Sequence, residues 1–179
     1  MKKLKDISLI VWDVEGTLFV ADALKTKKAN DVVRANCLSL LRSEPILELQ
    51  VGVKEILQYA HSSQISQGIV SDFAYQFAIN YLSASEAREF IDPDLIFLAH
   101  KFAWEGMILD KKNYEEVLAE YKKPQPKMLN LALEKTQEKI TRRISSNQCL
   151  FIGDQEIDEK TATLANWRFL YIGEILNGL

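Results

Sequence analysis

The chain has few of the residues that build disulfide frameworks or zinc sites. Its 179 residues include 2 cysteines and 2 histidines, and these form no cluster with the spacing of metal ligands. A disulfide framework is therefore excluded, and a zinc site is not expected. So few thiols in a chain of this size favour a reducing compartment, and we expect a cytoplasmic protein.

The chain also lacks a long apolar run and an excess of basic residues. No stretch of about 18 apolar residues occurs, so we predict no membrane span. The formal net charge of −3 gives no indication of nucleic-acid binding, which usually needs a basic surface. The content of 47% hydrophobic and 26% charged residues is typical of a soluble globular protein. The length fits one domain with a modest insertion.

Short apolar runs alternate with amphipathic stretches along most of the chain, a pattern typical of βαβ units with a parallel sheet. We expect helices that begin near Val53, Phe73, Pro126 and Asp158. The predicted strands are Ile7–Asp13, Gln67–Ser71, Leu95–His100, Gln148–Gly153 and Arg168–Ile172.

Two connections are longer than ordinary loops. The first covers residues 19–50, where Asp31 can cap a helix, so we expect a small helical insertion there. The second covers Lys101–Lys122 and includes an amphipathic piece near Asn113–Tyr121. Neither contains a repeat or a low-complexity tract.

Two acids follow the first predicted strand. Asp13 and Glu15 are two residues apart, so an extended chain directs both side chains the same way. Ligands of open α/β sheets bind at this carboxyl end of the strands. Two acids in one small space repel each other unless a cation, a shared proton or a positive neighbour is present. A pair of solvated turn carboxylates is the simpler alternative.

Further polar residues stand at the other strand ends or helix starts. Each has an ordinary explanation: a helix cap for Ser71, a loop for Lys123 before its Pro-x-Pro turn, and a favourable helix dipole for Asp158. That explanation is weaker for Asp154, which ends a strand. In a parallel sheet these ends lie side by side, so the residues converge on one crevice. Carboxylates there suit Mg²⁺, which binds oxygen ligands and keeps waters for a phosphate to replace.

Taken together and in order, these segments resemble the haloacid dehalogenase-like phosphatases across essentially the whole chain. The resemblance implies a three-layer α/β fold with a parallel five-stranded sheet in the order 3-2-1-4-5, and residues 19–50 as a small cap insertion in a single domain 1–179. It also implies Mg²⁺-dependent hydrolysis of a phosphate monoester. The motifs are Asp13-Val14-Glu15-Gly16-Thr17-Leu18, Ser71, Lys123 with its Pro-x-Pro, and Gly153-Asp154-Gln155-Glu156-Ile157-Asp158.

The resemblance also implies a role for each site residue. Asp13 would be the nucleophile that forms an aspartyl-phosphate, and Glu15 the general acid and base, with its backbone carbonyl on the metal. Ser71 and the amides near Val14 and Asp72 would bind phosphoryl oxygens. Lys123 would neutralise Asp13 and the developing charge. Asp154 would bind Mg²⁺, and Asp158 would support the metal directly or through water.

Glu15 departs from most phosphatases of this family, which have aspartate there. The Asp-x-Glu-Gly-Thr pattern resembles the enolase-phosphatase branch, but the shorter insertion argues against carrying over that substrate. A dehalogenase with the same fold is one alternative, but such enzymes usually lack an acid at the position of Glu15. A receiver-like domain that accepts a phosphoryl group is a second alternative, but it carries its accepting aspartate on a later strand. A catalytically weak relative that binds a phosphorylated ligand or a protein partner is the other alternative.

The small cap leads to expectations about partners. It seals the crevice incompletely, so either a large or macromolecular substrate enters or a second subunit completes closure. We therefore expect a phosphorylated small molecule or a macromolecule as substrate, and a homo-oligomer is one outcome.

Overall fold

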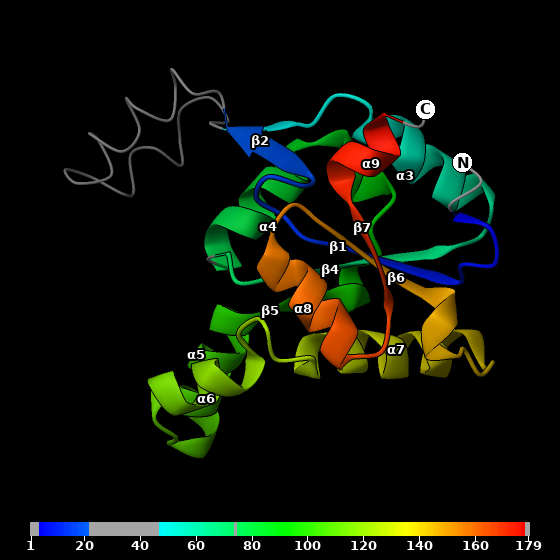
Figure 1. Ribbon diagram of the computed structural model, residues 1–179. Coiled ribbons are helices and arrows are strands. Elements are labelled where there is room, and N and C mark those ends of the chain that lie inside the picture. Colours follow the sequence, from blue (N-terminus) through cyan, green and yellow to red (C-terminus); the bar gives the residue numbers. More distant parts are fainter. Residues whose placement is uncertain (1–3, 22–46, 74, 178–179) are drawn as a thin grey trace.

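The computed structural model describes residues 4–21, 47–73 and 75–177, and its centre is a parallel five-stranded sheet (Figure 1). The strands follow the order β5-β4-β1-β6-β7, which is the predicted order 3-2-1-4-5, and all neighbouring pairs are parallel. The bounds are Leu9–Trp12 for β1, Ser66–Ser71 for β4, Ile96–Leu98 for β5, Cys149–Gly153 for β6 and Arg168–Tyr171 for β7.

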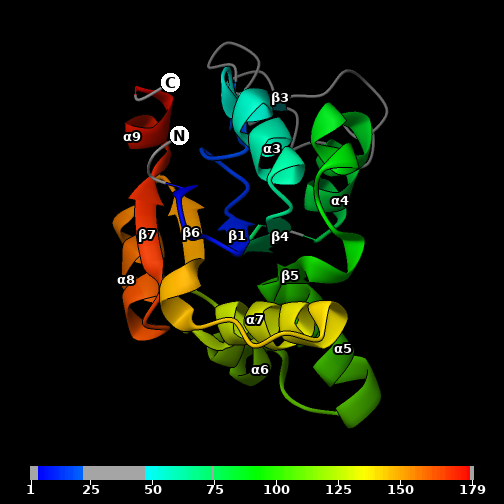
Figure 2. The ribbon, with the colours of Figure 1, turned by 90° about the vertical axis from the view of Figure 1, so that its right-hand side faces the viewer.

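Helices cover both faces of the sheet and make the expected three-layer sandwich (Figure 2). One face carries α3 (Val53–Ser62), α4 (Tyr75–Ala84) and α9 (Ile172–Leu176). The other carries α5 (Ala99–Asp110), α6 (Tyr114–Tyr121), α7 (Lys127–Ile140) and α8 (Glu156–Leu164). Short 3-10 helices span Glu86–Glu89, Pro93–Leu95 and Ser146–Gln148. Over the described ranges, no helix has the length and apolar character to cross a bilayer.

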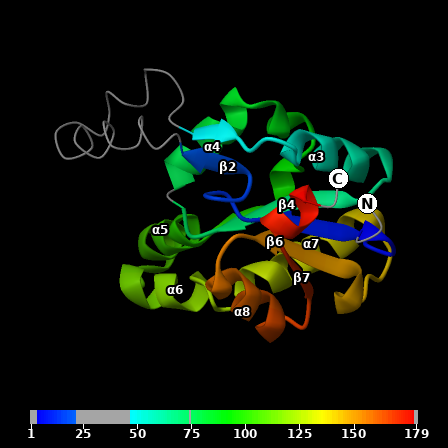
Figure 3. The same ribbon diagram turned by 45° about the horizontal axis from the view of Figure 1, so that its top comes forward.

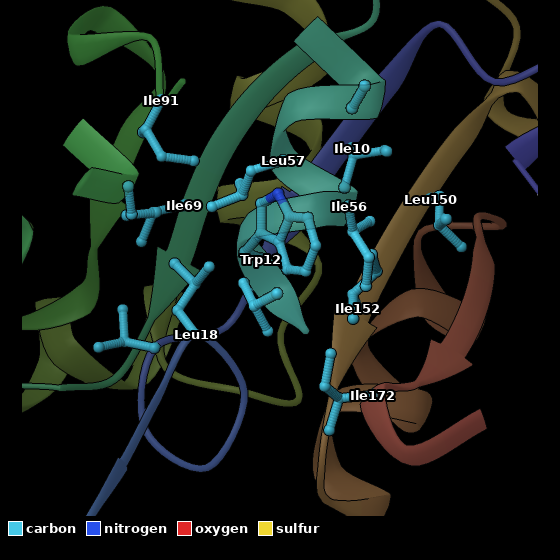
Figure 4. Close-up of a cluster of buried hydrophobic side chains, with 14 of the residues drawn as sticks. Ile10, Trp12, Leu18, Ile56, Leu57, Ile69, Ile91, Leu150, Ile152 and Ile172 are labelled. Carbon is cyan, nitrogen blue, oxygen red and sulfur yellow. The ribbon is translucent and has the colours of Figure 1, made fainter. Parts of the chain in front are cut away.

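The central strand β1 sends side chains into both hydrophobic cores. Ile10 and Trp12 enter the core under α3, whereas Leu9 and Val11 enter the one under α7. Figure 4 shows Trp12 within the first cluster. Its indole Nε1 donates a buried hydrogen bond to Oε1 of Gln67 at 3.3 Å, which satisfies a polar group that burial would otherwise penalise.

The helix predicted to begin near Val53 is confirmed as α3, and one face of it is buried. Its buried residues are Val53, Ile56, Leu57 and Ala60, at helical spacing. Burying a Val, Leu or Ile side chain stabilises the fold by roughly 1.5–3 kcal/mol. This packing fixes α3 against the sheet.

The long connection over residues 19–50 begins and ends in strands. β2 (Phe19–Ala21) pairs antiparallel with β3 (Leu47–Leu49), with Phe19 opposite Leu49. The helix expected to begin at Asp31 lies outside the described residues. The described ends of the connection therefore pair with each other as two short strands.

Candidate active site

The carboxyl ends of three neighbouring parallel strands, β4, β1 and β6, lie side by side at one end of the sheet. Asp13 directly follows β1, Ser71 ends β4, and Asp154 follows the end of β6. The backbone N–H of Asp13 donates to the carbonyl of Ile152 at 2.9 Å, so the position of this aspartate is tied to the neighbouring strand. The fold thus brings together segments from the beginning, middle and end of the chain.

Lys123 places a buried ammonium group among these acids. Its Nζ donates to Oδ1 of Asp13 at 2.9 Å and to Oδ1 of Asp158 at 2.5 Å. The side chain is 7% exposed. Burial opposes the charged form, but the charges of Asp13 and Asp158 outweigh it and raise the pKa of Lys123. The lysine therefore stays charged at neutral pH.

Asp13 lies in an environment that resists its ionisation. Burial and the nearby charge of Asp158 raise its pKa to about 6, against the opposing effects of Lys123 and of a hydrogen bond with Ser71. Without a further cation, one ammonium only partly compensates the carboxylates. The site consequently favours additional positive charge.

Asp154 is held close to the turn after β1. Its Oδ1 accepts a hydrogen bond from Oγ1 of Thr17 at 3.4 Å. Burial raises the pKa of Asp154, and the nearby negative charge of Asp158 raises it further. Gly16 makes this approach feasible: its φ is 80°, and a Cβ there would overlap the Asp154 carboxylate. The sequence reasoning assigned no role to the Thr17 hydroxyl, although its place in the first motif is the signal that would have found it.

Asp158 is fully buried and uses both carboxylate oxygens. Oδ1 accepts a hydrogen bond from the Lys123 ammonium. Oδ2 accepts hydrogen bonds from the backbone N–H groups of Asp154 at 3.2 Å and Gln155 at 3.1 Å. It lies in the first turn of α8, which begins two residues before the predicted start. Its contacts connect the lysine to the turn that carries Asp154.

Ser71 is the last residue of β4, and Asp72 begins the loop between β4 and α4. Oγ of Ser71 accepts a hydrogen bond from the Phe73 N–H at 3.1 Å, which makes a local turn and not a cap of α4, because that helix begins at Tyr75. Ser71 also contacts Asp13 by a hydrogen bond that lowers the pKa of that acid. Oδ1 of Asp72 accepts from the backbone N–H of Lys123 at 3.1 Å.

The side chain of Glu15 is not gathered with the other acids. It is exposed, and the carboxylate cluster of the described residues contains Asp13, Asp154 and Asp158 instead. The pKa of Tyr81 on α4 is raised by burial and then by the charge of Glu15. Glu15 is therefore near enough to α4 for its charge to act on Tyr81.

The donor set fits Mg²⁺. One oxygen from each of Asp13, Asp154 and Asp158 lies within 4.8 Å of the other two, with neither histidine nor cysteine among them. Three carboxylates against the single ammonium of Lys123 leave two negative charges uncompensated. A divalent cation would balance that charge.

Comparisons with known proteins give structural matches only. No protein-family model matches the chain, and no curated protein matches its sequence. A HAD-superfamily hydrolase of Ehrlichia chaffeensis has 14% identity and a TM-score of 0.60 over 96% of this chain and 95% of its own. CbbY of Rhodobacter sphaeroides, solved with phosphate, has 16% identity and a TM-score of 0.61 over 92% and 85%. A subfamily IA hydrolase of the same superfamily from Geobacter sulfurreducens has 14% identity and a TM-score of 0.55 over 92% and 86%.

The chain has the fold of the haloacid dehalogenase (HAD) hydrolases. The resemblance carried by the four motifs is thus confirmed for the fold. The order of the HAD sheet seen here puts β1 at the centre, between β4 and β6. A receiver-like domain would have the order 2-1-3-4-5, so that alternative is wrong.

Proposed function

We propose that the protein is a Mg²⁺-dependent phosphatase that hydrolyses a phosphate monoester through an aspartyl-phosphate on Asp13. One observation carries the proposal: a buried ammonium, that of Lys123, contacts Asp13 within a cluster of three carboxylates at the carboxyl edge of the sheet. Phosphoryl transfer depends chiefly on positioning and charge neutralisation, and this set supplies both.

In the first step a carboxylate oxygen of Asp13 forms a bond to phosphorus while the bond to the leaving oxygen breaks. Glu15 gives its proton to the leaving oxygen and then takes a proton from the water that attacks the aspartyl-phosphate. That attack releases inorganic phosphate and restores Asp13. The exposed side chain of Glu15, outside the carboxylate cluster, leaves it free for this exchange.

Other residues would hold the charges in place. Asp13, Asp154, Asp158 and the Glu15 carbonyl would hold Mg²⁺, which supplies charge stabilisation for the phosphoryl oxygens. Lys123 favours the ionised form of Asp13. Its ammonium group would also neutralise charge on the phosphoryl oxygens. The hydroxyl of Ser71 and the amide of Asp72 would donate to the phosphoryl group.

We also propose that residues 19–50 form a small cap insertion within a single domain of residues 1–179. A cap of this size favours either a phosphorylated small molecule as substrate, with a second copy of the chain completing closure, or a macromolecular substrate. One structure of CbbY holds xylulose-(1,5)-bisphosphate, so sugar phosphates belong in any substrate panel.

A panel of phosphorylated metabolites, aryl phosphates and phosphopeptides tests the proposal, with Mg²⁺ and with a chelator. We expect phosphate release that needs Mg²⁺ and differs between substrates. Absence of release across the panel, together with Mg²⁺-dependent binding of phosphate, would contradict the enzyme proposal and favour the binding domain.

A further inference from the structure

We propose that the Asp72 carboxylate is a positioning group that fixes the backbone of Lys123, and that it does not bind the substrate. The inference rests on the proposed function and assigns a role within the same site. Asp72 is adjacent to Ser71 in the sequence but is 51 residues from Lys123, so the fold alone creates the contact.

The contact is a hydrogen bond to the main chain of Lys123. Oδ1 of Asp72 lies 3.1 Å from that backbone nitrogen. Lys123 stands between the end of α6 and Pro124, which has no N–H to donate. The preceding residue, Lys122, still donates to the helix through Leu118 at 2.8 Å. Asp72 therefore holds the chain at the point where it leaves α6.

That position determines where the ammonium lies. The Lys123 side chain has four rotatable bonds, and it reaches from this backbone to both Asp13 and Asp158. α6 packs mainly on α5, and the pair extends away from the sheet edge in Figure 3. The hydrogen bond with Asp72 ties the end of this helical pair to β4, and a displacement of about 1 Å at a catalytic group can cost up to about 10²-fold in rate.

The charge of Asp72 argues against a direct role on the substrate. A carboxylate at this end of the sheet repels a phosphoryl dianion, whereas a backbone N–H is a favourable partner for it. Burial raises the pKa of Asp72, and the hydrogen bond from the Lys123 N–H together with the charges of Lys123 and Lys122 opposes that rise. One oxygen of the carboxylate, Oδ1, already accepts a hydrogen bond from the protein itself.

Two substitutions separate the positioning role from substrate binding. Asp72→Asn keeps an oxygen that can accept from the Lys123 N–H, whereas Asp72→Ala removes it. We expect Asp72→Ala to lower kcat about tenfold to 10²-fold with little change in KM, and Asp72→Asn to stay within about threefold of wild type. Asp110→Asn, at an exposed ion pair with Lys112, is the matched control.

A second readout does not depend on activity. Acetylation of lysines, followed by mass spectrometry, compares buried Lys123 with its exposed neighbour Lys122 in the same molecule. We expect the Lys123 to Lys122 ratio to rise about tenfold in Asp72→Ala and to stay near wild type in Asp72→Asn. This measurement works even if no substrate is hydrolysed, so failure of the proposed function and failure of this inference are distinguishable.

The outcomes are decisive for the role of Asp72. A loss confined to KM in Asp72→Ala would mean that the carboxylate contacts the substrate, and an unchanged Lys123 ratio would mean that it does not hold the lysine. If Asp72→Ala fails to fold, Asp72→Ser replaces it, because a hydroxyl is too short to keep the bond. Equal kinetics and equal labelling in all variants overturn the proposal.

Discussion

The ammonium nitrogen of Lys123 lies 2.9 Å from Oδ1 of Asp13, although the two residues are 110 positions apart. Both side chains are almost fully buried. Removing either partner from a buried ion pair leaves an uncompensated charge, which costs far more than losing a surface pair. The pair is therefore important for both stability and the proposed chemistry.

Lys123→Met should destabilise the metal-free protein by about 3–5 kcal/mol, because Asp13 and Asp158 lose the cation between them. Mg²⁺ should recover part of that loss. Urea unfolding with Mg²⁺ and with a chelator measures it. Lys127→Met is the control, since its solvent-exposed pair with Glu120 should contribute far less to stability. Equal costs for the two variants would contradict the account.

Gly16→Ala should lower Mg²⁺ affinity and destabilise the fold by about 1–2 kcal/mol. The residue has φ of 80°, and the new methyl group would displace the Asp154 carboxylate. Calorimetric titration with Mg²⁺ and thermal unfolding measure the two effects. Gly173→Ala is the comparison, because a Cβ there meets no atom within 4 Å. Unaltered Mg²⁺ binding in Gly16→Ala would disprove the proposed tight fit.

Glu15→Gln should reduce turnover by about 10²–10⁴-fold while leaving Mg²⁺ affinity near that of wild type. Glutamine cannot transfer the proton, and the Glu15 side chain lies outside the cluster of three carboxylates. Steady-state kinetics and calorimetry on the same preparation provide the two numbers. A large loss of Mg²⁺ affinity would show that this side chain binds the metal.

Stability at alkaline pH should depend on Cys149. Burial raises its pKa to about 12 from an ordinary value of 9.0. Between these values the unfolded chain loses the thiol proton and the folded protein keeps it, so the folded state loses stability as pH rises. The free energy of unfolding should therefore fall more steeply with pH in wild type than in Cys149→Ala. The difference in slope should correspond to at most about one bound proton. Parallel curves would contradict this prediction.

The parallel sheet and α3 were predictable because their signals are local and repeated. The apolar run that contains β1 is typical of a buried strand, and the apolar residues from Val53 to Ala60 follow the spacing of one helix face. The strand order follows from the family that the motifs resemble. Convergence of Asp13 with Asp154 followed from the rule that parallel strands align their carboxyl ends.

The boundary between β5 and α5 was wrong in the sequence interpretation. The predicted strand ran to His100, but β5 ends at Leu98 and α5 begins at Ala99. Gly106 in the following segment obscures a helical signal because glycine is a poor helix former. In the structure a Cβ at Gly106 would lie 3.1 Å from Val117, so this glycine permits close packing of α5 on α6. Such a tertiary contact leaves no local pattern.

The partner of the Asp72 side chain was equally invisible in the sequence. Its neighbour Ser71 suggested a phosphate-binding role, whereas the contact with the Lys123 backbone depends on where α6 ends relative to β4. A main-chain partner carries no residue-type signature. Positions of this kind can be assigned only from coordinates.

Phosphate release by Asp13→Asn is the most direct test of the central claim. It should be measured at saturating Mg²⁺ on the best substrate of the panel, beside wild type and Asp110→Asn. We predict a loss of at least about 10³-fold in Asp13→Asn and wild-type turnover in Asp110→Asn. Equal phosphate release by Asp13→Asn and wild type would contradict the assignment of Asp13 as the nucleophile.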